Sequence, residues 1–182
     1  MTGYYYHVYN RGVNFEKIFY IQENWQYFLR RLRRYFDPKK VDLIAYCLMP
    51  NHYHLLVFLK INDFSLKVMH PFTVSYTKAI NKQQGRVGSL FQGPFQANQV
   101  DNDAYLLHLS RYIHLNPVDA GLVPLPEDWE YSSYRNYVGV CKDAIVHADI
   151  ILEQFATPKE YADFVCSELE PEAALSDDML FD

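Results

Sequence analysis

The sequence predicts an α+β fold: a four-stranded antiparallel sheet with two packed helices, followed by one extra helix. Candidate strands and helices follow one another in the order β-α-β-β-α-β-α. A short turn at Pro50-Asn51 separates the second and third strands, so these two strands pair antiparallel. Hydrophobic residues make up 49% of the 182 residues, which is enough to bury a core. The first six elements match the ferredoxin-like split β-α-β arrangement.

The first half of the chain supplies three strands and one helix. Residues 4–10 are aromatic and β-prone, which is typical of a strand. Residues 22–36 carry apolar side chains at helical spacing, and Pro38 follows as a stop signal. Residues 41–48 and 54–60 are the second and third strands, on either side of the short turn.

The next segment supplies a helix, a loop and the fourth strand. Residues 64–82 have helical spacing, and Pro71 must either kink this helix or mark its true start. Residues 83–94 contain three glycines and no apolar period, so we expect a loop. Residues 95–100 are expected to form the fourth strand.

The third helix is expected over residues 103–116. Asp103 would cap its start, and Pro117 would prevent it from continuing. We expect residues 121–140 to wrap back on the domain. One domain would therefore cover residues 1–140, and residues 141–182 would be an acidic extension, partly mobile beyond Thr157.

Charge is distributed unevenly along the chain. The net charge is −5, but residues 1–142 hold 16 Lys and Arg against 11 Asp and Glu. Residues 143–182 hold Lys159 alone against 11 acidic residues. The basic body is suited to phosphate contacts, and the acidic tail would be repelled by them.

Cysteine content and hydropathy indicate the expected compartment. The three cysteines form no CxxC pair, so neither a disulfide framework nor a zinc knuckle is expected. No segment approaches the roughly 18 apolar residues of a membrane helix, and the N-terminus lacks the pattern of a secretory signal. We expect a cytoplasmic protein that has no membrane partner.

Two histidines begin the third strand with one residue between them. Side chains at i and i+2 of a strand lie on one face, so His52 and His54 project together. Two imidazoles can hold two positions on one divalent metal. Short His-x-His motifs are also common by accident, and the pair alone is compatible with polar residues at a strand edge.

The third helix supplies a second pair of polar side chains. Tyr112 and Asn116 are four residues apart and share a helix face. Such a pair can place a phenol beside a metal that the amide oxygen helps to bind. The pattern alone also fits half-buried packing, because a chain with 16 tyrosines yields such pairs freely.

Together the motifs resemble the REP-associated tyrosine transposases, within the single-tyrosine HUH (His-hydrophobic-His) transposase superfamily. The resemblance covers about residues 3–140, and the long second motif, placed before the tyrosine helix, makes it specific. It is carried by Asn10-Arg11-Gly12, by AYCLMPNHYHLLV at residues 45–57, and by RYIHLNPV at residues 111–118.

The resemblance implies a metal-assisted DNA nicking and strand-transfer enzyme. His52, His54 and Asn116 would bind the divalent metal, and the resemblance favours Mg²⁺ or Mn²⁺. Tyr112 would attack the scissile phosphate of single-stranded or hairpin DNA and form a 5′-phosphotyrosine. His114 lies on another helix face, so we expect it to be a packing residue. A homodimer that exchanges the tyrosine helix is an open possibility, because related enzymes include such dimers.

Several basic residues are candidates for contact with DNA phosphates. Lys82 and Arg86 border the glycine-rich loop, which is a plausible element for gripping DNA. Arg11 and Arg111 belong to the motifs described above. Pro94, Gln96 and Asp119 depart from the family, whose members often have basic residues at these positions.

Two non-catalytic functions remain as alternatives. A split β-α-β sheet also occurs in RNA-recognition modules, but their basic aromatic signature is missing here. A domesticated palindrome-binding protein that no longer cuts DNA is the second alternative. The intact set of His52, His54, Tyr112 and Asn116 favours an enzyme.

Overall fold

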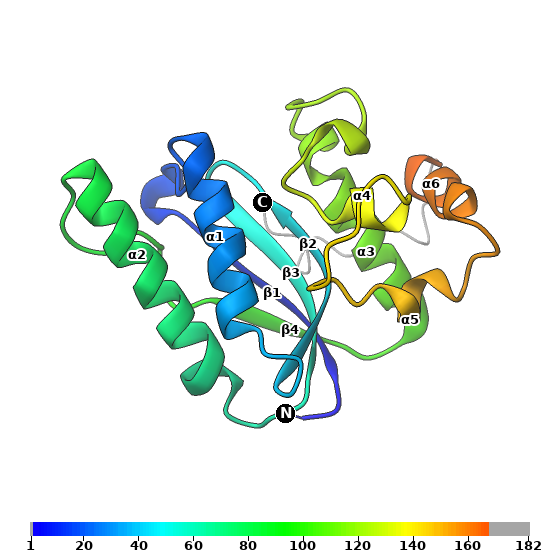
Figure 1. The fold of residues 1–182 in the computed structure, drawn as a ribbon, viewed down its shortest axis with the longest axis horizontal. Helices are drawn as coiled ribbons and strands as arrows, with labels where there is room; N and C mark the ends of the chain where they lie inside the picture. The colour runs from blue at the N-terminus through cyan, green and yellow to red at the C-terminus, as the bar shows by residue number, and fades with distance from the viewer. Residues whose placement is uncertain (1, 168–182) are drawn as a thin grey trace.

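Four strands form one antiparallel sheet in the computed structural model, which describes residues 2–167 (Figure 1). The spatial order is β2-β3-β1-β4, as the split β-α-β arrangement requires, so the predicted fold class is confirmed. Tight pairing of β2 with β3 follows from the short turn at Pro50-Asn51. The strands are β1 (Tyr5–Arg11), β2 (Val41–Leu48), β3 (His52–Leu59) and β4 (Gln96–Val100).

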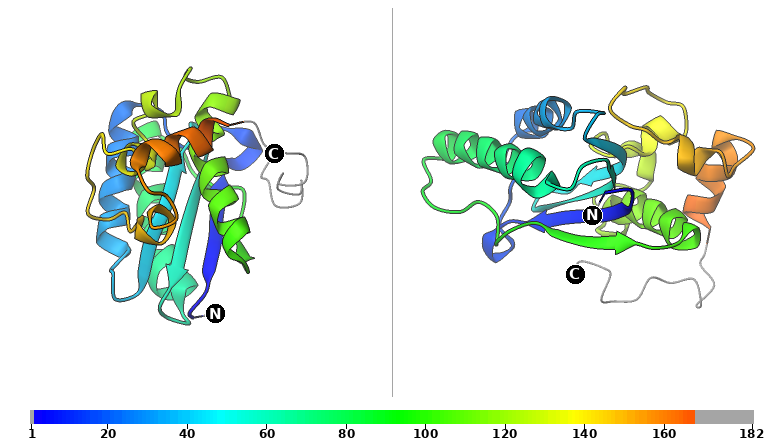
Figure 2. Two further views of the ribbon diagram at one scale, coloured as in Figure 1. Left: turned by 90° about the vertical axis from the view of Figure 1, so that its right-hand side faces the viewer. Right: turned by 90° about the horizontal axis from the view of Figure 1, so that it is seen from below.

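Two helices, α1 (Gln22–Tyr35) and α2 (His70–Gln84), cover one face of the sheet (Figure 2). Apolar side chains of both helices, including Phe28 and Phe72, are buried in one core with alternate residues of β1 and β3. Pro71 lies in the first turn of α2, and a π-helical turn, Ser65–Met69, runs directly into that turn. The helical segment therefore begins before Pro71, and the π-helical turn is the irregularity that accompanies the proline.

The other face of the sheet is covered by the extra helix, α3 (Asp103–Asp119), and by short helices that follow it (Figure 2). Leu109 and Ile113 of α3 belong to a second core with Ala45 and Leu56 of the sheet. Both faces of the sheet are thus buried by helices, and β3 in the middle is hydrophobic on both sides. The short helices are α4 (Tyr134–Tyr137), α5 (Asp149–Leu152) and α6 (Pro158–Cys166).

Helix α3 begins at Asp103 as predicted, but the predicted cap residue and the predicted C-terminal end are wrong. Its N-cap is Asn102, whose side-chain oxygen accepts a hydrogen bond from the backbone N–H of Tyr105. At the other end the helix passes through Pro117 and ends at Asp119. Pro117 lies close enough to the end that few backbone bonds are at stake, and the Ala120 N–H still closes the last turn on the Asn116 carbonyl.

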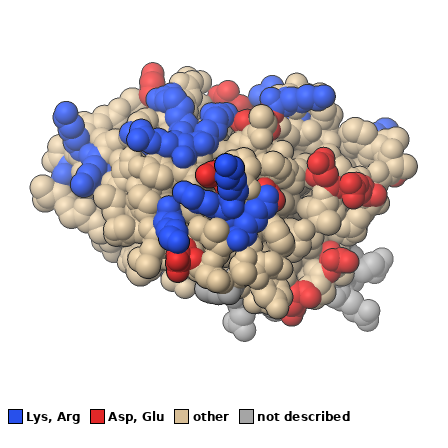
Figure 3. Space-filling model, turned by 60° about the horizontal axis from the view of Figure 1, so that its bottom comes forward, with Lys and Arg blue, Asp and Glu red and all other residues tan. Residues whose placement is uncertain are grey.

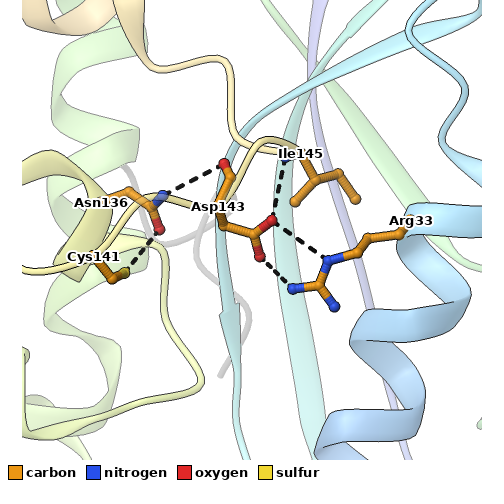
Figure 4. Close-up of polar contacts among 5 residues, drawn as sticks. All are labelled: Arg33, Asn136, Cys141, Asp143 and Ile145. Atoms are coloured by element: carbon orange, nitrogen blue, oxygen red, sulfur yellow. Dashed lines mark hydrogen bonds and ion pairs between the residues drawn. The ribbon is translucent and has the colours of Figure 1, made fainter.

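Part of the acidic extension is folded against the body. Tyr161 and Val165 of α6 are fully buried in the core that contains α3. Arg33 of α1 forms a 2.5 Å ion pair with Asp143, whose backbone carbonyl accepts a bond from Asn136 (Figure 4). The expected domain limit at residue 140 therefore does not coincide with the end of the packed core. Residues 168–182 of the expected mobile tail lie outside the described residues.

Candidate active site

His52 and His54 lie side by side on the face of the sheet that α3 covers. Their ring centroids are 5.0 Å apart and the rings are nearly perpendicular, at 85°. The alternation of side chains along β3 places both on this face and sends Tyr53 into the opposite core. His52, at the first position of the strand, is partly exposed, whereas His54 is completely buried.

Helix α3 brings Tyr112 and Asn116 to this histidine pair. The Tyr112 ring lies 5.4 Å from the His54 ring, centroid to centroid. One turn later, the Asn116 side-chain oxygen lies 3.2 Å from Nε2 of His52. The four side chains that the sequence singled out from two distant segments are therefore neighbours within one chain.

The geometry at His52 fits two ligands of one cation. Nδ1 of His52 is 2.7 Å from the side-chain oxygen of Asn51, and a proton on Nδ1 would donate to that oxygen. In that tautomer Nε2 presents a lone pair toward the Asn116 oxygen at 3.2 Å. Two ligands about 2.1 Å from one ion, at right angles, are about 3 Å apart. A metal could therefore be held by these two atoms, with His54 as the third ligand.

One of the three proposed ligands, the Asn116 amide, is not an ionisable group. Within residues 2–167, no cluster of three or more His, Cys, Asp or Glu side chains could hold a metal ion. The predicted site therefore depends on two imidazoles and the Asn116 amide oxygen. Neutral nitrogen ligands with one oxygen do not select one divalent metal by themselves.

A third histidine, which the sequence analysis missed, lies behind His54. His7 of β1 is fully buried, and its Nε2 is 2.9 Å from Nδ1 of His54. Burial lowers the pKa of His7 to about 3. Burial, with the neighbouring His7 and His52, also lowers the pKa of His54 well below its usual value. Both rings are therefore neutral near pH 7.

The sequence did contain a signal for His7. Tyr5, His7 and Tyr9 alternate along the first strand, so they share one face of the sheet. What the sequence could not give is the register, in which His7 is paired with Leu56 and Tyr9 with His54. That register brings the His7 ring diagonally against His54.

His114 is a packing residue, as expected. It is fully buried, its Nδ1 is 2.7 Å from the Tyr161 hydroxyl, and its Nε2 is 2.8 Å from the Ser133 hydroxyl. Burial lowers its pKa to about 3. The residue ties α3 to α6 and to the segment before α4, and it does not face the histidine pair.

Arg11 is the predicted basic contact that lies beside the candidate site. It is paired with His52 across β1 and β3, and cross-strand partners project to the same face. Its guanidinium stacks over the ring of Phe15 at 4.1 Å, and Phe15 is 61% exposed. Phe15 has a positive φ of 60°, a strained conformation of the kind that clusters at functional sites. No pattern in the sequence indicated a role for Phe15.

The conformation of this turn depends on Gly12. A Cβ at this position would lie 2.0 Å from the Glu16 carbonyl oxygen, so no other residue fits without a shift of the backbone. The glycine of the Asn10-Arg11-Gly12 motif therefore allows the chain to fold back under Arg11.

The other three predicted DNA contacts lie elsewhere. Arg86 forms an ion pair of 3.0 Å with Glu16 and bonds to the Tyr20 hydroxyl. Arg111 donates hydrogen bonds to the backbone carbonyls of Phe164 and Ser167 at the end of α6. Lys82 is exposed on α2, on the opposite face of the sheet.

Basic and acidic side chains are unevenly distributed on one face of the molecule. On the face drawn in Figure 3, Lys and Arg side chains are concentrated toward the side of α1 and α2, with some acidic side chains among them. Asp and Glu dominate the half formed by the last helices. On this face the uneven charge along the sequence is therefore also an uneven charge in space.

Comparisons with known proteins agree with the fold and the motifs. The family model described as Transposase IS200 like matches residues 1–116. A protein of Haemophilus influenzae that carries the name REP-associated tyrosine transposase is 31% identical over 107 residues. The match covers 53% of this chain and 61% of that relative.

A solved structure of a REP-associated tyrosine transposase bound to a REP hairpin superposes with a TM-score of 0.61. It is 18% identical, and the match covers 80% of this chain and 85% of that one.

Proposed function

Because the chain belongs to the IS200-like transposase family, we propose that it nicks DNA and transfers the cut strand by means of Tyr112. The observation that carries the proposal is the meeting of four side chains. Tyr112 and Asn116 from α3 contact the pair of His52 and His54 on β3, all within one chain. Neither motif alone would assign this chemistry.

The proposed reaction exchanges one phosphodiester for another. The Tyr112 phenol gives up its proton, and its oxygen attacks the scissile phosphorus. The bond from phosphorus to the 3′-oxygen breaks, and that oxygen takes up a proton to become a free 3′-OH. The product is a 5′-phosphotyrosine. A second 3′-OH can attack this bond and release Tyr112, so rejoining needs no nucleotide hydrolysis.

A divalent ion, Mg²⁺ or Mn²⁺, is the proposed cofactor, and His52, His54 and Asn116 are its proposed ligands. When bound, it would polarise the scissile phosphate and offset the charge that develops during attack. The 3.2 Å separation of His52 Nε2 and the Asn116 side-chain oxygen is short enough for both atoms to reach one ion, which supports this ligand set. The protein itself keeps the tyrosine beside the pair and buries His54 away from water.

Single-stranded or hairpin DNA is the proposed substrate. The solved relative with the same fold is bound to a REP hairpin. In this chain, Arg11 lies beside His52 and supplies a cation next to the candidate site. The exposed Phe15 ring, which the Arg11 guanidinium covers on one side, supplies an aromatic surface on which a base can stack. DNA as the substrate also agrees with the expected cytoplasmic location.

Binding of RNA on an open sheet is disfavoured by the architecture. RNA-recognition modules stack bases on an exposed sheet face. Here α1 and α2 cover one face and α3 covers the other, with Phe28, Leu55 and Ile113 all buried.

In the described part of the chain no helix is both long and apolar enough to cross a membrane.

The proposal is tested by trapping the covalent product. The full chain is incubated with a 5′-labelled and, separately, a 3′-labelled single-stranded hairpin library in the presence of Mn²⁺. A denaturing gel should show protein joined to the 3′-labelled fragment, and chelation with EDTA should abolish it. Binding without any adduct in Mg²⁺ or Mn²⁺ would support the non-cutting palindrome binder instead.

A further inference from the structure

We infer that His7 is a positioning residue, which holds His54 in the tautomer that leaves its Nε2 lone pair available to the metal. The inference rests on the proposed metal site and adds a residue outside its three ligands. It concerns β1, a strand that supplies none of those ligands. His7 Nε2 and His54 Nδ1 are 2.9 Å apart, and both side chains are completely buried.

The hydrogen bond between the two rings can have only one direction when a metal is held. If His54 carries its proton on Nδ1, this N–H donates to Nε2 of His7, and Nε2 of His54 keeps its lone pair. If the bond runs the other way, His54 carries its proton on Nε2 and cannot be a ligand through that atom. His7 must therefore act as an acceptor in the metal-bound protein.

His7 does for His54 what Asn51 does for His52. In each case a side-chain acceptor lies against Nδ1, at 2.9 Å for His54 and 2.7 Å for His52. Metal-binding histidines regularly donate their second N–H to such a partner, which fixes the tautomer and the ring orientation. Here the partner of the buried ligand is a neutral imidazole, so no uncompensated carboxylate has to be buried.

The packing around His7 keeps its ring in place. The His7 and His54 rings are nearly parallel, with centroids 5.1 Å apart and an interplanar angle of 21°, so the two hydrogen-bonded rings meet edge to edge. Tyr9 lies 4.7 Å from the His7 ring and Tyr112 lies 6.3 Å from it. The aromatic neighbours leave little room for rotation, so the acceptor nitrogen stays directed at His54.

Binding of Mn²⁺ to the full chain without DNA tests the inference, because it does not depend on cleavage. Free Mn²⁺ is counted by electron paramagnetic resonance for the wild type, for H7F and for H7Q. Phe keeps a ring but accepts no hydrogen bond, so H7F should weaken Mn²⁺ binding about 10- to 100-fold. Gln offers an amide oxygen that accepts from His54, so H7Q should retain most of the affinity. H114Q, which alters a buried histidine that does not contact His54, is the matched control and should bind like the wild type.

A second measurement covers the case in which H7F does not fold. Nitrogen-15 NMR of the Mg²⁺-saturated wild type reads the His54 tautomer directly, and we expect its proton on Nδ1. A proton on Nε2 of His54, or equal Mn²⁺ affinity in folded H7F and the wild type, would overturn the role of His7 and leave the proposed function standing. Mn²⁺ binding that is unaffected by H52A and H54A would instead overturn the proposed metal site, and the inference with it.

Discussion

The rings of Tyr112 and His54 are nearly perpendicular, at 82°, with the two centroids 5.4 Å apart. Tyr112 comes from the helix that covers the sheet, and His54 comes from a strand in its middle. A single chain thus assembles the complete candidate site. The expected alternative, a homodimer that exchanges the tyrosine helix, is not needed to bring these groups together.

Mixing two inactive variants should not restore activity. Y112F lacks the nucleophile and H54A lacks a metal ligand, so a chain that uses its own tyrosine leaves both defects in place. The measurement is adduct formation with hairpin DNA after equimolar mixing. Recovery of about a quarter or more of wild-type adduct would mean that the tyrosine helix is exchanged between chains.

The metal ligands should differ in how much they matter. H54A removes a buried imidazole nitrogen, and water cannot easily replace it as a metal ligand. Mn²⁺ binding and adduct formation should therefore fall by at least about 100-fold. N116A should cost less, because water can occupy a vacated oxygen position in a hard-metal site. Both effects are measured by Mn²⁺ titration and single-turnover cleavage. Equal losses in the two variants would contradict the assigned ligand roles.

Local rules predicted the elements of the fold and which side chains share a face within each motif. Alternation places His52 and His54 on one face, and a spacing of four residues places Tyr112 and Asn116 on another. That these two pairs lie next to each other was predicted by the motif resemblance alone. No local sequence pattern indicates that α3 packs on this face of the sheet.

Other features depend on tertiary contacts and were missed for that reason. The interaction of His7 with His54 requires the register of β1 against β3, which no local pattern specifies. Arg111 stays a predicted DNA contact, and its hydrogen bonds to the carbonyls of Phe164 and Ser167 join segments more than 50 residues apart, so the sequence did not indicate them. Pro117 was read as a stop signal, whereas the packed end of α3 accommodates it.

Arg11 should contribute one phosphate contact to DNA binding. R11A should weaken hairpin affinity and lower the slope of log K against log salt by about 0.7–0.9, the value for one lost contact. The measurement is a fluorescence anisotropy titration at several salt concentrations. K159A removes a cation from the acidic half of the surface, where Lys159 is paired with Asp163, and should leave the slope unchanged. An unchanged slope in R11A would place Arg11 away from the DNA.

Acid should destabilise the protein partly through His114. Burial lowers the folded-state pKa of this group to about 3, below the unfolded value near 6.5. Its contribution is therefore fully present above about pH 6.5 and is lost as the pH falls toward 3. In H114Q the amide can still bond to Tyr161 and Ser133. The slope of unfolding free energy against pH between about 4 and 6 should then fall by about 1.4 kcal/mol per pH unit.

Urea unfolding at a series of pH values gives this slope for both proteins. H147Q, which changes a histidine whose side chain is 40% exposed, is the comparison variant. Identical slopes for the wild type and H114Q would show that His114 is not held neutral by burial.

The most direct test of the account is to identify the residue that becomes joined to DNA. Adduct formed with hairpin DNA and Mn²⁺ is digested with nuclease and protease, and mass spectrometry locates the nucleotide-bearing peptide. We expect a phosphotyrosine at Tyr112 in the wild type and no adduct in Y112F, which keeps the ring and should remain folded. An adduct on Tyr105, or one that persists in Y112F, would contradict the assignment of Tyr112 as the nucleophile.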